Sequence, residues 1–385
     1  MGLDESLALA CDFACIENDH CIRASNVSVP VLDLCRSNSA QLTPGANAEV
    51  TIVTGSSAPA IHCSPDCGDG STESIPAITQ TAELAVFCLS ILDIPQGVTI
   101  QSEANLPVPI ALVVEGSATV AGIIDLSGGT ASMTSAGSAG PGGGQGGALH
   151  GAQTENGKGP CPGLEGRRNN SNANTIGGGG GGGGHAGRGG KGGQGKAASG
   201  NQVASGGNGG GTCGSAELMP LVAGSGGGSG GDGSCDTCGW PGGGGGGAIQ
   251  ISSKTSLSFT GSIIASGGRG FHDLASQGFP YGGGGGGGSG GAVLLEAPTL
   301  TLSGSIVVDG GDGAASTAGP GGLGGQPGDL NGGAGSSQSG PGQAGAGGGG
   351  ASGRVRLNGS TSPNCLDIST CLLYTSDAAD DLLQV

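Results

Sequence analysis

This chain of 385 residues has few aromatic side chains, few basic side chains and no long apolar runs. Aromatic residues make up 2% of the chain, too few for the thick core of an ordinary globular domain. Lysine and arginine number 12 against 29 acidic residues, and the net charge of −17 argues against nucleic acids or anionic membranes as partners. No apolar run approaches the ~18 residues of a membrane-spanning helix, so we expect no transmembrane segment.

Half of the basic residues fall within 158–196, which is the one local exception to the acidic composition. No aromatic residue stands among them to stack on nucleic-acid bases. We therefore expect a solvated basic face and no nucleic-acid partner.

Glycine is the residue in excess, with 93 positions, whereas glycine makes up about 7% of average proteins. It does not recur at every third position, which excludes a collagen triple helix. The remaining apolar residues gather in short Val/Ile/Leu runs, which fit a narrow and repetitive core.

Three segments repeat one pattern with an internal glycine and a closing Gly-Gly: TVAGIIDLSGG (119–129), SFTGSIIASGG (258–268) and TLSGSIVVDGG (301–311). Each follows an apolar strand sequence, and a fourth copy begins with GRVRLN at 353–358. Units of three short strands predict an all-β fold of short parallel β-helix or solenoid coils. The isoleucines two residues after the internal glycines should then form one inward column, made of Ile124, Ile263 and Ile306.

Long glycine-rich insertions separate these units, at roughly 130–247, 269–291 and 312–352. They could be disordered loops, or extended polyglycine chains like polyproline II that pack side by side because no Cβ keeps them apart. A β-sandwich with glycine-rich loops is the alternative to the solenoid.

The cysteines are dense and lack the paired spacing of a metal site, so disulfides and an oxidising compartment are expected. Cys235 and Cys238 form a CxxC without a second pair, which favours a disulfide over a metal or redox site. We predict no metal and no cofactor. The disulfide candidates are Cys11, Cys15, Cys21, Cys35, Cys63, Cys67, Cys88, Cys161, Cys213, Cys235, Cys238 and Cys365.

Candidate chemistry is sparse. The acids associated with the repeats do not line up in register and are expected on the solvated outer face: Glu115, Asp125, Glu296 and Asp309. Trp240, Phe279 and Tyr281 stand directly before glycine runs. These aromatic residues could cap the glycine layer or form an exposed stacking platform for a sugar ring.

The segments GGGGGGSGGAVLLEAPTLTLSGSIVVDGG (283–311) and ALVVEGSATVAGIIDLSGG (111–129) resemble uncharacterised glycine-rich secreted and surface proteins of the myxobacterial type. This resemblance implies a bacterial extracellular or cell-surface location and no particular chemistry. The tail CLLYTSDAADDLLQV (371–385) resembles a translated sequencing adapter and is expected to be an artefact.

The sequence thus predicts a cysteine-rich region (1–88), a glycine-rich β-solenoid region (89–370) and the adapter-derived tail (371–385). The function expected is that of a non-catalytic structural protein outside the cell, such as an adhesin or coat component, with a cell-surface glycan or matrix as partner. A glycan-binding module using the three aromatic residues is the first alternative, and a β-helix enzyme acting on polysaccharides is the second.

Overall fold

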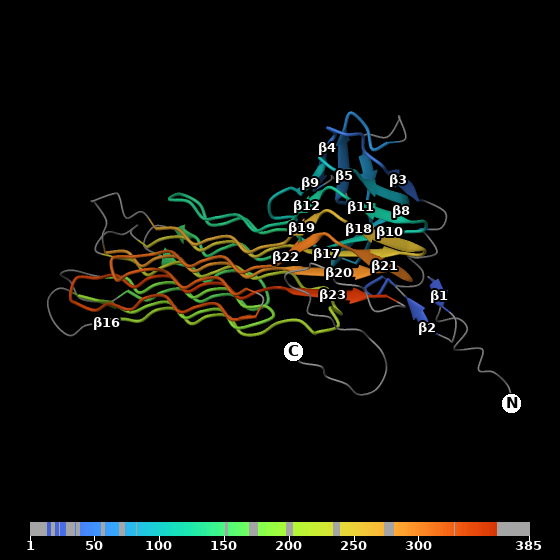
Figure 1. The fold of residues 1–385 in the computed structure, drawn as a ribbon. Helices are drawn as coiled ribbons and strands as arrows, with labels where there is room; N and C mark the ends of the chain where they lie inside the picture. Colours follow the sequence, from blue (N-terminus) through green and yellow to red (C-terminus); the bar gives the residue numbers. More distant parts are fainter. Residues whose placement is uncertain are drawn as a thin grey trace.

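The computed structural model describes residues 14–16, 20–22, 24–27, 35, 39–54, 58–68, 74–81, 83–150, 153–168, 176–197, 203–233, 239–272, 281–326 and 328–359. A compact body of β-strands carries a long layered extension built from the glycine-rich segments (Figure 1). Among the described residues there is no helix that is long and apolar enough to cross a membrane.

The larger sheet has ten strands, and eight of them form a curved, all-parallel path resembling half of a barrel. The path runs β21 (Thr299–Leu302), β18 (Ser256–Phe259), β11 (Ala118–Val120), β8 (Leu84–Ile94), β10 (Ile110–Val114), β17 (Ala248–Ser253), β20 (Ala292–Glu296) and β23 (Arg354–Asn358). Off this path, β3 (Ala40–Leu42) and β7 (Ile78–Thr81) also pair with β8.

The second sheet is mixed and has seven strands. Its order is β22 (Ser305–Val307), β19 (Ser262–Ile264), β12 (Ile123–Asp125), β9 (Thr99–Ser102), β4 (Glu49–Val53), β5 (Ala60–Ser64) and β6 (Ser74–Pro76). The strands from β22 to β4 are parallel, whereas β5 pairs antiparallel with both β4 and β6. Three hairpins complete the strands: β1 (Ala14–Ile16) with β2 (His20–Ile22), β13 (Leu149–His150) with β14 (Gln153–Thr154), and β15 (Gly195–Lys196) with β16 (Val203–Ala204).

The repeats pair with one another as the sequence predicts. Ile124, Ile263 and Ile306 are direct neighbours in register, each at most 1% exposed, and the predicted column is confirmed. The fourth copy also pairs in register, because β23 lies beside β20. The column faces a core formed between the two sheets by alternate residues of their strands.

The predicted β-helix solenoid is nevertheless wrong. The eight-strand path is a parallel half-barrel, the other sheet is mixed, and β8 continues as one strand of 11 residues beside both β10 and β11. Successive units are also far apart along the chain, since β12 ends at Asp125 and β17 starts at Ala248. The alternative of a β-sandwich with glycine-rich loops fails as well, because the glycine-rich segments do not behave as loops.

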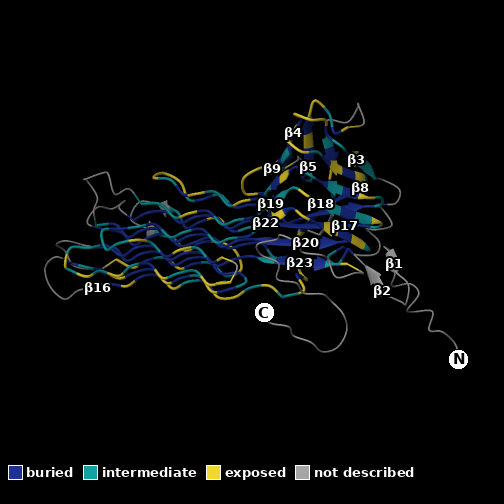
Figure 2. Ribbon diagram, in the orientation of Figure 1, coloured by how far each residue is buried: buried dark blue, intermediate teal, exposed yellow. Residues whose placement is uncertain are grey.

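These segments form an ordered structure that we call the glycine slab, made of the described residues within 126–247, 265–291 and 308–353. Its interior is buried, with exposed residues along its outer faces (Figure 2). Backbone hydrogen bonds join segments that are distant in sequence, such as Gly180 N–H to Gly284 O at 2.8 Å. The ordered alternative for the glycine runs is therefore the one found, and the disordered alternative does not hold for these residues.

Segment 281–291 shows how the glycine slab is built. Its backbone N–H groups point in three directions in turn, toward segments 225–231, 345–351 and 265–271. A Cβ added to Gly285, Gly286 or Gly287 would lie about 2 Å from a backbone oxygen of three further segments, at Pro241, Gly181 and Gly311. A period of three residues is that of a polyproline II helix. Six neighbouring segments thus surround this one in contact with its backbone, and a side chain at Gly285, Gly286 or Gly287 would push one of them away.

The internal glycines of the repeats serve a similar purpose. Gly122, Gly261 and Gly304 would each place a Cβ between 2.0 and 2.4 Å from a backbone oxygen of the adjacent unit. Their φ angles lie outside the left-handed region. Close approach of the backbone, rather than an unusual dihedral, therefore requires glycine at these corners.

Candidate functional site

A buried polar cluster on the larger sheet is the most developed chemical site among the described residues. It contains Gln250 and Ser252 from β17, Glu296 from β20 and Asn358 from β23, together with Ser25 and Asn26 from the N-terminal region. Parallel register brings Ser252, Glu296 and Asn358 directly side by side. Gln250, Ser252 and Glu296 are completely buried.

Glu296 is the centre of this cluster. Its Oε1 accepts hydrogen bonds from Ser25 Oγ and from Asn358 Nδ2 at 2.8 Å. Its Oε2 accepts from Ser25 N at 3.0 Å, Gln250 Nε2 at 3.0 Å and Ser252 Oγ at 2.7 Å. All of these partners are donors, which suits a carboxylate, because a carboxylate only accepts.

Burial raises the pKa of Glu296 above its ordinary value, while the hydrogen bonds from Ser25, Ser252 and Asn358 oppose that rise. In the described part of the chain no ion pair includes this carboxyl group. A buried carboxyl group with a raised pKa is a stronger base near neutral pH than an exposed one. The arrangement can therefore take up a proton from a neighbouring hydroxyl group.

The prediction that Glu296 lies on a solvated face is wrong. The side chains of β17 and β20 that point away from the main core pack against a second apolar cluster, which includes Ala24, Val27, Leu218 and Leu221. No pattern in the sequence predicts that the segments carrying these covering residues lie against the sheet. The only signal was that glutamate ends a strand, AVLLE, that is otherwise wholly apolar.

The other acids remain apart from this cluster. Glu115 forms an ion pair with Lys254 at 3.2 Å, and Asp125 accepts hydrogen bonds from Ser127 at its own strand end. Asp309 is half-buried, and its burial raises the pKa of the carboxyl group. Among the residues that the structure describes, no group of His, Cys, Asp and Glu side chains could hold a metal ion.

The aromatic residues do not form an exposed platform in the described residues. Trp240 is 3% exposed and packs edge-on against Phe271, with ring centroids 5.5 Å apart. Tyr281 is half-buried, and Phe279 lies outside the described residues. Trp240 is thus not available to stack on a sugar, and its role as a cap on the glycine layer stays a prediction.

Three disulfides close the described parts of the chain: Cys35–Cys88, Cys63–Cys67 and Cys161–Cys213. Disulfides persist in oxidising compartments, so these bonds suggest that the protein resides in one. Cys15 and Cys21 oppose each other in the β1–β2 hairpin register. Cys11, Cys235, Cys238 and Cys365 lie outside the described residues.

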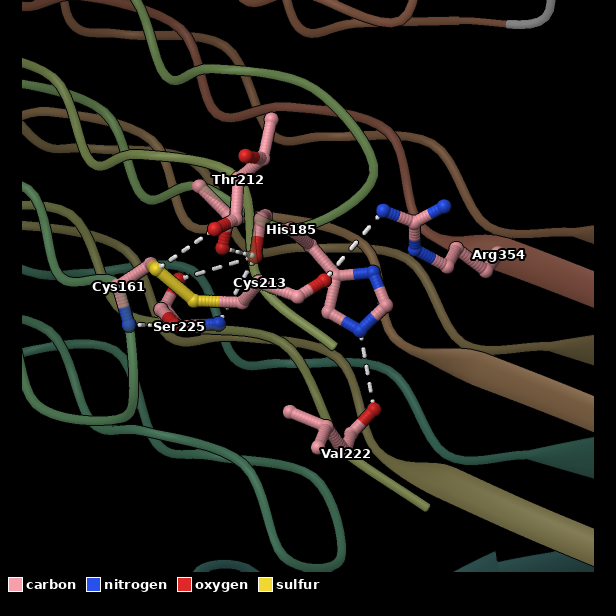
Figure 3. Close-up of a disulfide and its surroundings, with 9 residues drawn as sticks. Cys161, His185, Thr212, Cys213, Val222, Ser225 and Arg354 are labelled. Carbon is pink, nitrogen blue, oxygen red and sulfur yellow. Dashed lines mark hydrogen bonds between the residues drawn. A yellow bond between two sulfur atoms is a disulfide. The ribbon is translucent and has the colours of Figure 1, made fainter. Parts of the chain in front are cut away.

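A second buried site lies next to the Cys161–Cys213 bond (Figure 3). His185 is completely buried, and its Nε2 lies 2.9 Å from the carbonyl oxygen of Val222. A carbonyl can only accept, so Nε2 carries the proton of the neutral ring and Nδ1 carries the lone pair. The guanidinium group of Arg354 stands on the other side of the ring and donates to Cys213 O at 3.5 Å.

Burial is the main cause that lowers the pKa of His185 to about 4, and the positive charge of Arg354 lowers it further against the opposing bond to Val222. The unfolded chain therefore binds a proton between pH 6.5 and 4 that the folded chain excludes. We expect the free energy of unfolding to fall by about 3 kcal/mol from this group as the pH drops from 7 to 4. Urea unfolding at several pH values measures this loss.

The matched variant is His185→Gln, whose amide can still donate to Val222 O. Its stability should depend less on pH over the same interval. Glu296 acts in the opposite sense, because a raised pKa stabilises the fold below pH 4.5 and this contribution is lost as the pH rises through the folded value. The difference between wild type and variant in the pH dependence of the unfolding free energy gives the contribution of His185. Identical pH profiles would contradict the lowered pKa of His185.

Comparison with known proteins found no matching family model, no similar curated protein and no similar solved structure.

Proposed function

We propose that this chain is a non-catalytic structural protein of the cell surface or extracellular space, of the adhesin or coat type, as its resemblance to glycine-rich secreted proteins implies. The observation that carries the proposal is the glycine slab, in which each segment is held by several others through backbone hydrogen bonds. Such a body is stiff and presents a long regular surface. The three disulfides agree with a location outside the cytoplasm.

The two alternatives have less support. Trp240 is buried, which removes one of the three side chains proposed for stacking on a glycan. The repeat-associated acids do not converge, since Glu115 and Asp125 have separate local partners and Glu296 lies in a different, buried cluster. A glycoside hydrolase needs two carboxyl groups facing one substrate bond.

Limited proteolysis tests whether the protein is built as a durable external element. Arg188 and Lys191 have exposed side chains, but the backbone beside them is bonded into the glycine slab through Gly189, Gly190 and Gly192. A protease must draw several residues into its cleft, so trypsin should leave both sites intact for hours in the native protein and cut them quickly in urea. Mass spectrometry of the fragments gives the sites.

Rapid cleavage after Arg188 or Lys191 under native conditions would contradict the proposal that the glycine slab is a stiff structural element. A screen of polysaccharides for release of reducing ends tests the enzymatic alternative. Turnover by the wild type that Asp125→Asn abolishes would overturn the non-catalytic proposal.

A further inference from the structure

We propose that Ser25 and Gln250 form an intramolecular ester, in which Ser25 Oγ bonds to Cδ of Gln250 and ammonia is released. The bond would join the N-terminal region to strand β17 across the surface of the larger sheet. It requires no cofactor, no metal and no second protein.

The nucleophile and its base are already in contact. The hydroxyl group of Ser25 donates to Oε1 of Glu296, and the backbone N–H of Ser25 donates to Oε2 at 3.0 Å. Two bonds from one residue fix the position of the serine against the carboxylate. A serine hydroxyl becomes a useful nucleophile when an adjacent base accepts its proton, and Glu296 is that base here.

The amide of Gln250 is polarised for attack. Its Oε1 accepts hydrogen bonds from the backbone N–H of Asn26 at 3.3 Å and from Asn26 Nδ2 at 2.9 Å. A backbone N–H can only donate, so the oxygen of the Gln250 amide must face Asn26 and its nitrogen must face Glu296. Two donors at a carbonyl oxygen stabilise the negative charge that develops there when a nucleophile adds to the carbon.

Asn26 is itself held in place, because its Nδ2 also donates to the carbonyl oxygen of Leu218 at 2.9 Å. The residue that carries the donors directly follows the nucleophile in sequence. Nucleophile and oxyanion donors therefore approach Gln250 as one unit.

The leaving nitrogen lies beside the same carboxyl group. Gln250 Nε2 donates to Glu296 Oε2 at 3.0 Å and to Ser252 Oγ at 2.9 Å. Glu296 gains the proton of Ser25 as the C–O bond forms and gives a proton to this nitrogen as the C–N bond breaks. The products are the ester and one molecule of NH₃, and Glu296 returns to its starting state.

Burial favours the product. Gln250, Ser252 and Glu296 are all 0% exposed, which limits the access of water to the ester carbonyl. Ser25 and Asn26 are partly exposed, so the ammonia has a route to solvent, where it is diluted. Ser252 and Asn358 keep the carboxylate oriented from the neighbouring strand positions. The buried polar cluster thus has the parts of an acyl-transfer site with an internal acceptor and a single turnover.

Mass spectrometry of the purified full chain tests the ester after incubation at neutral pH. The measured mass of the disulfide-intact protein should be about 17 Da below the mass calculated from its sequence with the same disulfides. This difference is the mass of the ammonia that the serine displaces. After reduction and trypsin digestion under denaturing conditions, peptide 24–36, which contains Ser25, should be joined to peptide 197–254, which contains Gln250. Alkaline hydroxylamine should separate the two.

Matched variants identify the chemistry. Ser25→Ala and Glu296→Gln should give the full mass and two separate peptides. Ser253→Ala should keep the joined peptides, because the hydroxyl group of this neighbouring serine donates to Gly116 O and Ser256 O and accepts from Thr255 N, all outside the buried polar cluster. Full-mass, unjoined peptides 24–36 and 197–254 from the wild type would overturn the proposal. So would a 17 Da loss that maps to an Asn-Gly succinimide instead of a joined pair.

Discussion

Replacing Gly286 by alanine should destabilise the protein by about 3 kcal/mol or more, or prevent its folding. The new Cβ would lie 2.1 Å from the carbonyl oxygen and 2.6 Å from the carbonyl carbon of Gly181. Both are backbone atoms, so no flexible side chain can move aside. Gly181 is itself bonded to segments on its other sides, and the strain would spread through the glycine slab.

Gly211→Ala is the matched control. It belongs to the same slab, but a Cβ there meets no atom within 4 Å. We expect its free energy of unfolding to stay within about 0.5 kcal/mol of the wild type. Guanidinium unfolding of both variants gives the comparison, and an equal effect at the two positions would argue against close backbone packing in the glycine slab.

Replacing Ile124 by aspartate should cost about 4 kcal/mol or more. The side chain is 0% exposed, and its direct neighbours in register, Ile100 and Ile263, offer a carboxylate no polar partner. Its sequence neighbour Ile123 is 40% exposed, so Ile123→Asp should cost at most about 1 kcal/mol. Thermal and denaturant unfolding of the pair tests the inward column, which two similar losses would contradict.

The strand register was accessible from sequence because each repeat carries its own side-chain pattern. Ile124, Ile263 and Ile306 alternate with residues that are at least partly exposed, and a slip of one residue would turn each of them away from the core. A run such as 282–288 carries no pattern of this kind. Identical residues cannot indicate which segment lies beside which, so the architecture of the glycine slab, and with it the failure of the solenoid, could not be read from sequence.

The buried sites were missed for a different reason. Alternation predicts which side chains leave the core of a sheet, but it does not predict whether another segment covers them. Glu296 is enclosed by residues from 24–27 and 218–223, and His185 by Val222 and Arg354. These contacts join residues up to 271 positions apart in the sequence, and no local sequence pattern predicts them.

The interleaving of the glycine slab also sets the order of events during biogenesis. Segment 281–291 bonds to residues made earlier, 225–231, and to residues made later, 345–351. A growing chain therefore cannot finish this layer until its last segment has been synthesised, and contacts of such high sequence separation form slowly. The glycine slab therefore cannot be completed segment by segment during synthesis, and the N–H groups of segment 281–291 that bond to residues 345–351 lack these partners until those residues have been made.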